Sequence, residues 1–156
     1  MREKKINILY IHHGTGIGGA LISLRNLISA LNSDLYAITV LCLKYSEGID
    51  YFRIRGIDCR IVKSKFYNNQ YTRFTHSEPG MIKWYQPIRF FKALSSYFLS
   101  KYYYAPKILA DFDFDILHLN SVSLVDWLYA GNKVGKTITY MLTSQFGVTY
   151  CCDVHM

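Results

Sequence analysis

The residues best suited to chemistry lie in a glycine-rich turn near the start of the sequence. This turn, His13–Gly19 (HGTGIGG), separates an apolar segment from a helical pattern. Glycines allow the backbone to bend sharply and approach a ligand, and the amides of a following helix can bind phosphate. We therefore expect Gly16, Gly18 and Gly19 to contact the phosphate of a ligand. A tight strand-to-helix turn without a ligand is the alternative.

Two common phosphate-binding patterns fit this turn poorly. Gly14, Gly16 and Gly19 satisfy the G-x-G-x-x-G spacing of a dinucleotide-binding turn. Dinucleotide binding also needs an acidic residue at the end of the second strand, where this sequence has Leu43 and Lys44. A P-loop would need Gly-Lys-Ser/Thr at the end of the turn, and this sequence has no such triplet there. Dinucleotide binding therefore stays as the weaker interpretation.

Histidines near the ends of two expected strands are the other candidates for chemistry. His12 and His13 precede the turn, and alternation along a strand should point one into the sheet and the other into the cleft. His118 lies near the end of another expected strand, at the edge where open α/β sheets bind ligands, and is the candidate catalytic residue. A buried structural histidine is the competing interpretation at each position.

Metal chemistry has little support in the sequence. Cys151, Cys152 and His155 lie close together, but structural zinc usually needs C-x2-4-C spacing and four ligands. Cys42 and Cys59 fall inside expected strands, and four cysteines are too few for a disulfide scaffold. We therefore expect no metal site, no bound cofactor and a reduced cytoplasmic setting.

The elements that must position these residues alternate between strands and helices. Strands are expected at 6–11, 36–43, 57–62, 115–120 and 137–142, and helices at 20–31, 47–55, about 87–104 and from Ser121 or Ser123 to about Val134. Residues 63–80 are polar and predict a long loop. This alternation predicts a Rossmann-like three-layer α/β/α domain with a mostly parallel sheet, and the length fits a single domain over residues 1–156.

Two segments together resemble a known enzyme family. In the first, residues 8–27, a strand leads into the Gly18-Gly19 loop and then into a helix. The second, residues 113–121 (DFDILHLNS), is similar to the fourth-strand pattern D-hydrophobic-hydrophobic-H-hydrophobic-N/H-S of family 4 glycosyltransferases. Residues 4–143 thus resemble the N-terminal half of a two-domain enzyme of the GT-B fold.

The resemblance implies a hexosyltransferase-like enzyme that needs no bound metal. Such enzymes transfer a sugar from a nucleotide-sugar donor to a glycan or lipid-linked acceptor, in bacteria often during surface polysaccharide synthesis. The N-terminal domain mainly holds the acceptor, and its glycine loop reaches the donor phosphates. By this resemblance Gly18 and Gly19 match the loop, and His118 matches the fourth-strand edge that faces the cleft. The candidate acceptor-cleft residues are His13, Asn120 and Ser121.

Two features depart from the family pattern. Residues 139–144 (TYMLTS), at the end of the fifth strand, contain no histidine, so the catalytic histidine often found there has no counterpart. The sequence also ends at Met156, before any C-terminal donor domain, so we expect weak donor binding and little or no transfer by this chain alone. The alternatives are a non-catalytic subunit that partners a separate donor-binding chain, and a nucleotide- or dinucleotide-binding domain of another enzyme.

The segment 84–107 is both aromatic and basic. The whole chain carries a net charge of +7, which favours an anionic partner. Aromatic side chains interleaved with lysine and arginine suit an anionic membrane surface, so we expect peripheral contact with the inner membrane face. An ordinary crossover helix packed on the sheet is the alternative. We recognise no nucleic-acid-binding module, and no run reaches the roughly 18 apolar residues of a spanning helix.

Overall fold

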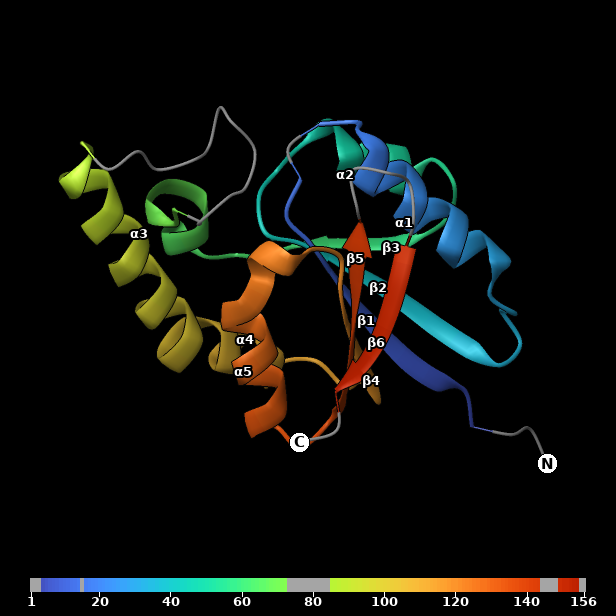
Figure 1. Cartoon of the computed structure of the whole chain (residues 1–156). Coiled ribbons are helices and arrows are strands. Elements are labelled where there is room, and N and C mark those ends of the chain that lie inside the picture. Colours follow the sequence, from blue (N-terminus) through green and yellow to red (C-terminus); the bar gives the residue numbers. More distant parts are fainter. Residues whose placement is uncertain (1–3, 15, 73–84, 144–148, 155–156) are drawn as a thin grey trace.

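A six-stranded sheet lies between two layers of helices in the computed structural model of the chain (Figure 1). The structure describes residues 4–14, 16–72, 85–143 and 149–154, and for Val122, 140–143 and 149–154 it describes the backbone alone. In chain order the elements are β1 (Ile6–His12), α1 (Gly19–Ala30), β2 (Tyr36–Cys42), α2 (Glu47–Arg53), β3 (Asp58–Ile61), the π-helical turn η1 (Phe66–Gln70), α3 (Pro87–Leu99), the π-helical segment η2 (Ser100–Tyr104), α4 (Ala105–Leu109), β4 (Ile116–Leu119), the 3-10 turn η3 (Val122–Leu124), α5 (Val125–Lys133), β5 (Thr137–Thr143) and β6 (Thr149–Val154).

The strand order of the sheet is β3-β2-β1-β4-β5-β6. Strands β1 to β5 are parallel, and β6 runs antiparallel to β5. The chain builds outward from β1 to β3 and then returns to place β4 on the other side of β1. The predicted Rossmann-like α/β/α domain with a mostly parallel sheet is therefore confirmed. The reversal of order puts a topological switch point between β1 and β4, where ligands bind at the carboxyl ends of the strands in such sheets.

Two hydrophobic cores, one on each face of the sheet, hold the layers together. Strand β1 supplies both, because alternate side chains point to opposite faces: Ile8 and Tyr10 to one, Leu9 and Ile11 to the other. Helix α1 covers the first face with Leu21, Leu24 and Ile28, and α2 adds Ile49 and Phe52. Helices α4 and α5 cover the second face with buried residues that include Leu109 and Trp127. The sheet and the start of α1 are thus fixed firmly relative to each other.

The predicted loop at 63–80 is wrong for its described part, residues 63–72. Here the chain forms η1, because three aromatic residues outweigh the polar composition: Phe66, Tyr67 and Tyr71 are all buried. Tyr67 packs on Trp127 with ring centroids 5.6 Å apart. Residues 73–80 lie outside the described residues.

The helix predicted at 87–104 begins at Pro87 as expected but continues to Leu109. The continuation includes Pro106, although proline disfavours a helix interior because it lacks an N–H and its ring clashes with the carbonyl four residues earlier. Just before it, η2 has the wider π-helical spacing, with the Ala105 N–H donating to Ser100 O. This local widening is where a helix can change its hydrogen-bond register and accept a proline.

Strand β6 is an addition to the strands predicted from the sequence, and it extends the sheet beyond β5. Among the described residues, no helix is long and apolar enough to cross a membrane.

Candidate functional site

Three segments meet at the switch point between β1 and β4. They are the turn that follows β1, the first turn of α1, and the connection from β4 to η3. The parallel register places Ile11 of β1 beside Leu119 of β4, so the residues after each strand emerge at one edge. Because the predicted glycine turn and Asn120 both follow these strands, the fold brings them together although they are about a hundred residues apart in sequence.

Asn120 connects β4, β1 and the start of α1 through its hydrogen bonds. Its side chain is 1% exposed, and Nδ2 donates to Ala20 O at 3.1 Å and to His12 Nδ1 at 3.0 Å. Its backbone N–H donates to Ile11 O at 3.1 Å. Oδ1 is buried without a hydrogen-bond partner among the described residues. Asn120 therefore positions the start of α1 against both strands and does not itself face solvent.

His12 and His13 divide between interior and edge, as strand alternation predicted. His12 is 1% exposed and lies edge-on to Phe52, with ring centroids 6.2 Å apart. Because its Nδ1 accepts from Asn120, the ring proton is assigned to Nε2. A Cβ on Gly14 would lie 2.7 Å from His12 Nε2, so the missing side chain at Gly14 makes room for this ring. His13 is half-buried at the edge.

The remaining described glycines of the turn have open space around them. A Cβ built on Gly16, Gly18 or Gly19 would meet no atom of the described residues within 4 Å, and none of the three has a φ in the left-handed region. Gly18 is extended, with φ −125° and ψ −179°. Neither backbone strain nor packing against the described residues accounts for glycine at these positions. Close approach by a molecule from outside is one physical reason, and at Gly18 the preference of helix N-caps for glycine over alanine is another. Thr15 lies outside the described residues.

The first turn of α1 is open as well. Gly18 provides no side-chain cap, and the first turn contains no acidic residue. The start of α2, by contrast, carries Glu47 and Asp50. A helix N-terminus exposes backbone N–H groups and a partial positive charge. At α1 no side chain of the helix neutralises that charge.

Polar groups line the other side of the edge, after β4. Of the two serines expected at the start of the next helix, Ser121 caps η3, with Oγ accepting from Ser123 N at 3.2 Å. Ser123 Oγ lies 3.0 Å from Ser121 Oγ and 3.4 Å from His13 Nε2. From the sequence, Ser123 was expected only as a possible helix cap. Its contact with His13 joins residues 110 positions apart, which no local pattern predicts. His13, Ser121 and Ser123 thus form a small polar group whose donors and acceptors could bind a ligand hydroxyl.

His118 lies inside the sheet, where it pairs with Tyr10 of β1, one position before the last pair of the two strands. It is 3% exposed, and its Nδ1 is hydrogen-bonded to Thr139 Oγ1 at 2.7 Å. The Tyr10 ring lies beside it, with centroids 4.8 Å apart. Burial disfavours the charged form and lowers the pKa of His118 to about 4. The structure thus places the candidate catalytic histidine in a neutral, interior position, apart from His13 and Ser121.

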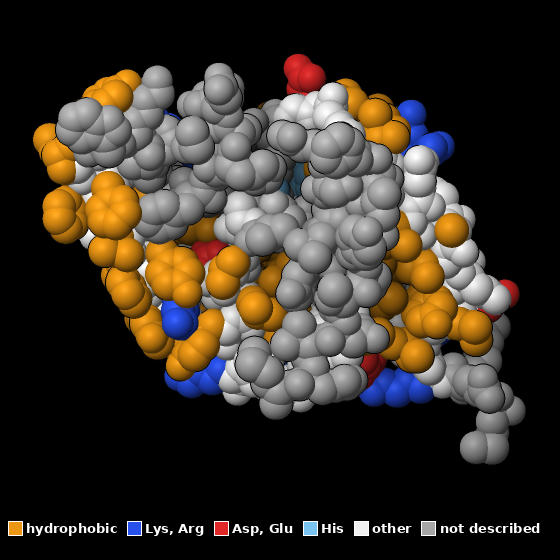
Figure 2. All heavy atoms as spheres, in the orientation of Figure 1, with side chains coloured by type: hydrophobic (Ala, Val, Ile, Leu, Met, Phe, Trp, Pro, Cys, Tyr) orange, Lys and Arg blue, Asp and Glu red, His pale blue; other side chains and the backbone are white. Residues whose placement is uncertain are grey.

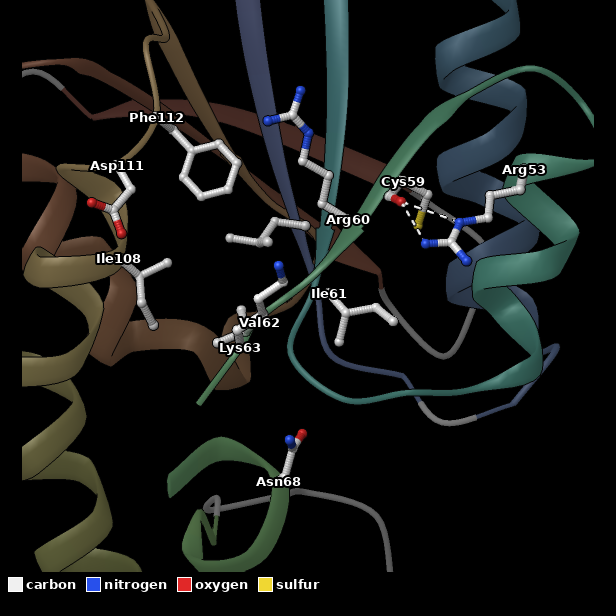
Figure 3. A pocket seen from close by; sticks show the side chains of 11 residues that line it. Arg53, Cys59, Arg60, Ile61, Val62, Lys63, Asn68, Ile108, Asp111 and Phe112 are labelled. Atoms are coloured by element: carbon white, nitrogen blue, oxygen red, sulfur yellow. Dashed lines mark hydrogen bonds between the residues drawn. The ribbon is translucent and has the colours of Figure 1, made fainter. Parts of the chain in front are cut away.

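A cavity of about 640 Å³ lies elsewhere, beside the edge strand β3 (Figure 3). Its two arginines have partners within the protein, and Lys63 also lines it. Arg53 donates through Nε and a terminal nitrogen to Cys59 O, both at 3.4 Å, and Arg60 pairs with Asp58 at 3.0 Å. Asn68 of η1 and Phe112 also line it. Strand β2 separates this cavity from the β1 end of the switch point, so we regard the two as different places.

Cys42 and Cys59 lie in strands, as expected. Their Sγ atoms are 3.6 Å apart on β2 and β3, and both thiols are free. Within the described ranges, no group of three or more His, Cys, Asp or Glu residues could hold a metal ion.

By fold, the chain belongs to the broad class of Rossmann-like α/β/α domains. Its sequence matches no protein-family model, and no curated protein matches it. Among solved structures it is similar to the C-terminal domain of a hydrogenase from Pyrococcus furiosus, with a TM-score of 0.49 and 12% sequence identity. That similarity covers 91% of this chain and 95% of the other.

Proposed function

We propose that this chain binds the diphosphate of a nucleotide sugar at the turn His13–Gly19. In this proposal it serves as the acceptor-side domain of a glycosyltransferase that builds surface polysaccharide. One observation carries the proposal: open glycines lead directly into the uncapped N-terminus of α1 at the switch point of the sheet. Open backbone and a helix N-terminus are the features with which such folds bind phosphate groups.

The two sides of the edge would have different roles. Backbone N–H groups at Gly18, Gly19 and the start of α1 would stabilise the negative charge that develops on the departing nucleotide diphosphate. On the β4 side, His13, Ser121 and Ser123 offer half-buried polar groups for the hydroxyls of a sugar acceptor. The family resemblance assigns the rest of the donor site to a separate C-terminal domain.

This activity implies a cellular setting as part of the proposal. A nucleotide-sugar donor and a glycan or lipid-linked acceptor would meet in the cytoplasm, at the inner face of the membrane. A non-catalytic subunit that partners a donor-binding chain would use the same phosphate contacts.

A dinucleotide-binding domain of another enzyme is the second candidate, and the strand order favours it as well. The switch point between β1 and β4 is the place where dinucleotides bind in this fold. The end of β2 argues against it, because Leu43 and Lys44 offer no carboxylate to a ribose.

Calorimetric titration of the chain with UDP-glucose, GDP-mannose, pyrophosphate and NAD tests the proposal. We expect a nucleotide sugar to bind more tightly than pyrophosphate, and NAD not to bind. Gly18→Ala should weaken that binding about tenfold or more, equivalent to 1.4 kcal/mol, because the added methyl occupies the space of the phosphate. Ala30→Ser is the matched control, since it adds one heavy atom at the exposed far end of α1.

Two results would contradict the transferase proposal. Binding of NAD, lost in Gly18→Ala, without binding of any nucleotide sugar would favour the dinucleotide domain. Equal affinity of Gly18→Ala and the unaltered chain for a nucleotide sugar would place the ligand away from the turn.

A further inference from the structure

Helix α3 and the π-helical segment η2 expose many of their large apolar side chains, although Tyr104 stacks on Phe66. Ile88 is 85% exposed, Phe91 63%, Phe98 46% and Tyr102 53%. Together they form one stripe, because positions three, four and seven apart share a helix face. Leu99 and Tyr103 widen it, at 48% and 57% exposure. These six residues are called the outward face of α3 and η2 below. Figure 2 shows apolar side chains gathered along the side of the molecule where α3 lies.

The side facing the protein has the opposite character. The buried residues of these two segments are Ala93, Ser96 and Ser100. A crossover helix packed on the sheet would bury its large apolar residues and expose its small and polar ones. The alternative of an ordinary crossover helix therefore does not describe α3.

Buried hydrogen bonds fix this orientation. Ser96 Oγ donates to Gln70 O at 3.3 Å and accepts from Thr72 N at 3.2 Å. Ser100 Oγ is 2.6 Å from the hydroxyl of the buried Tyr67. Turning the helix to hide Phe91 or Phe98 would break these bonds, so the described residues leave the outward face open to a partner surface.

The charge on this part of the chain identifies the covering. Residues 85–110 contain no aspartate or glutamate. Lys92 and Lys107 are exposed, and the Lys101 ammonium lies 5.0 Å from the Tyr102 ring centroid and 4.3 Å from that of Tyr129. A second copy of the chain on this face would bring lysines against lysines. The face fits a surface that is both apolar and anionic.

We propose that the outward face of α3 and η2 lies on an anionic lipid bilayer. The apolar residues form a convex stripe on one helix, which can lie in the plane of a membrane interface. Tyrosine rings suit the headgroup level, where the ring is partly buried and the hydroxyl stays hydrated. Lysines beside them attract anionic headgroups. This surface contact is independent of the glycosyltransferase proposal, because none of its residues belongs to the switch-point site.

Co-sedimentation with vesicles tests this surface. We expect the chain to bind phosphatidylcholine vesicles that contain phosphatidylglycerol, to bind pure phosphatidylcholine much less, and to be released by salt. Ile88→Ser/Phe91→Ser should weaken binding about tenfold or more, since two apolar side chains leave the bilayer. Lys92→Gln/Lys107→Gln should weaken it about fivefold per lysine.

The matched control is Ile54→Ser at the end of α2. Ile54 is 82% exposed, close to the value for Ile88, but lies outside the outward face. Ile54→Ser should bind vesicles as the unaltered chain does. Equal binding of the Ile88→Ser/Phe91→Ser and Ile54→Ser variants would overturn the proposal, as would equal binding to both kinds of vesicle. A dimer in solution that Ile88→Ser/Phe91→Ser converts to a monomer would also overturn it, in favour of a second copy as the occupant.

Discussion

Glycines in two regions of this molecule have opposite surroundings. Inside the domain, a Cβ on Gly131 of α5 would lie 2.6 Å from Leu117 Cδ2 and 2.9 Å from Ile138 Cδ1. At the start of α1, a Cβ on Gly18 or Gly19 would meet no atom of the described part of the chain within 4 Å. The chain itself explains the first glycine, because a helix must approach the sheet closely there. It does not explain the other two, and this difference separates a packing position from a candidate binding position.

The same contrast runs along one face of β4 and the residue after it. His118 is enclosed, with its ring between Tyr10 and Thr139. Asn120, two residues further, is also buried but lies directly beneath the open turn and holds Ala20. Substitutions at enclosed positions should therefore change the free energy of unfolding, whereas substitutions in the open turn should change the affinity for a ligand.

The largest effect is expected from pH at His118. Its pKa is about 4 in the folded chain against 6.5 ordinarily, so the unfolded chain binds the extra proton between these values. The contribution of His118 to stability is complete above pH 6.5 and is lost as the pH falls towards 4, by about 3 kcal/mol. Denaturant unfolding measures the free energy of unfolding of the unaltered chain and of His118→Gln. The difference between the two free energies should shrink by that amount as the pH falls over this range.

Direct titration is the check if His118→Gln does not fold. The NMR shifts of the His118 ring should stay those of a neutral imidazole down to near the pH at which the fold is lost. A pKa near 6.5 for His118 would contradict the enclosed position that the structure gives it.

A smaller effect is expected from filling the space at Gly131. Gly131→Val should lower the free energy of unfolding by about 2 kcal/mol, because overpacking costs more than the valine gains in helix propensity. Lys133→Val is the control on the exposed side of the same helix, with an expected change within about 0.5 kcal/mol. Chemical denaturation measures both. Affinity for a nucleotide sugar, measured on folded protein, should be unchanged in either variant.

Much of this architecture could be predicted from local patterns. Continuous apolar runs at 6–11 and 36–43 match β1 and β2, and the spacing of Leu21, Leu24 and Ile28 marks the buried face of α1. The glycine turn was a site candidate because it follows an expected strand, and Asn120 was one through the family resemblance; that either binds a ligand stays a prediction. Their meeting at one edge follows from parallel pairing, which the strand-helix alternation already implied.

The remainder depends on contacts between distant residues, which no local pattern records. The burial of His118 follows from Tyr10 and Thr139 on the neighbouring strands. The approach of Ser123 to His13 depends on the path of the chain after β4. The outward turn of α3 depends on the bonds of Ser96 to Gln70, at the end of η1, and to Thr72 just after it. The composition of α3 alone fits either a membrane-facing helix or a helix packed on the sheet.

The smallest change in stability is expected at Gly18, and it is the most informative. Alanine can adopt the extended φ and ψ of Gly18. Because alanine makes the unfolded chain less flexible, this substitution stabilises the fold by about 0.4–1 kcal/mol. Alanine is also a poorer helix N-cap than glycine, by a similar amount. The two effects nearly cancel, so Gly18→Ala should unfold within about 0.5 kcal/mol of the unaltered chain while losing affinity for a nucleotide sugar. A loss of more than about 1 kcal/mol in the free energy of unfolding would show that Gly18 is a packing position like Gly131. The open turn would then no longer support the proposal of a ligand site.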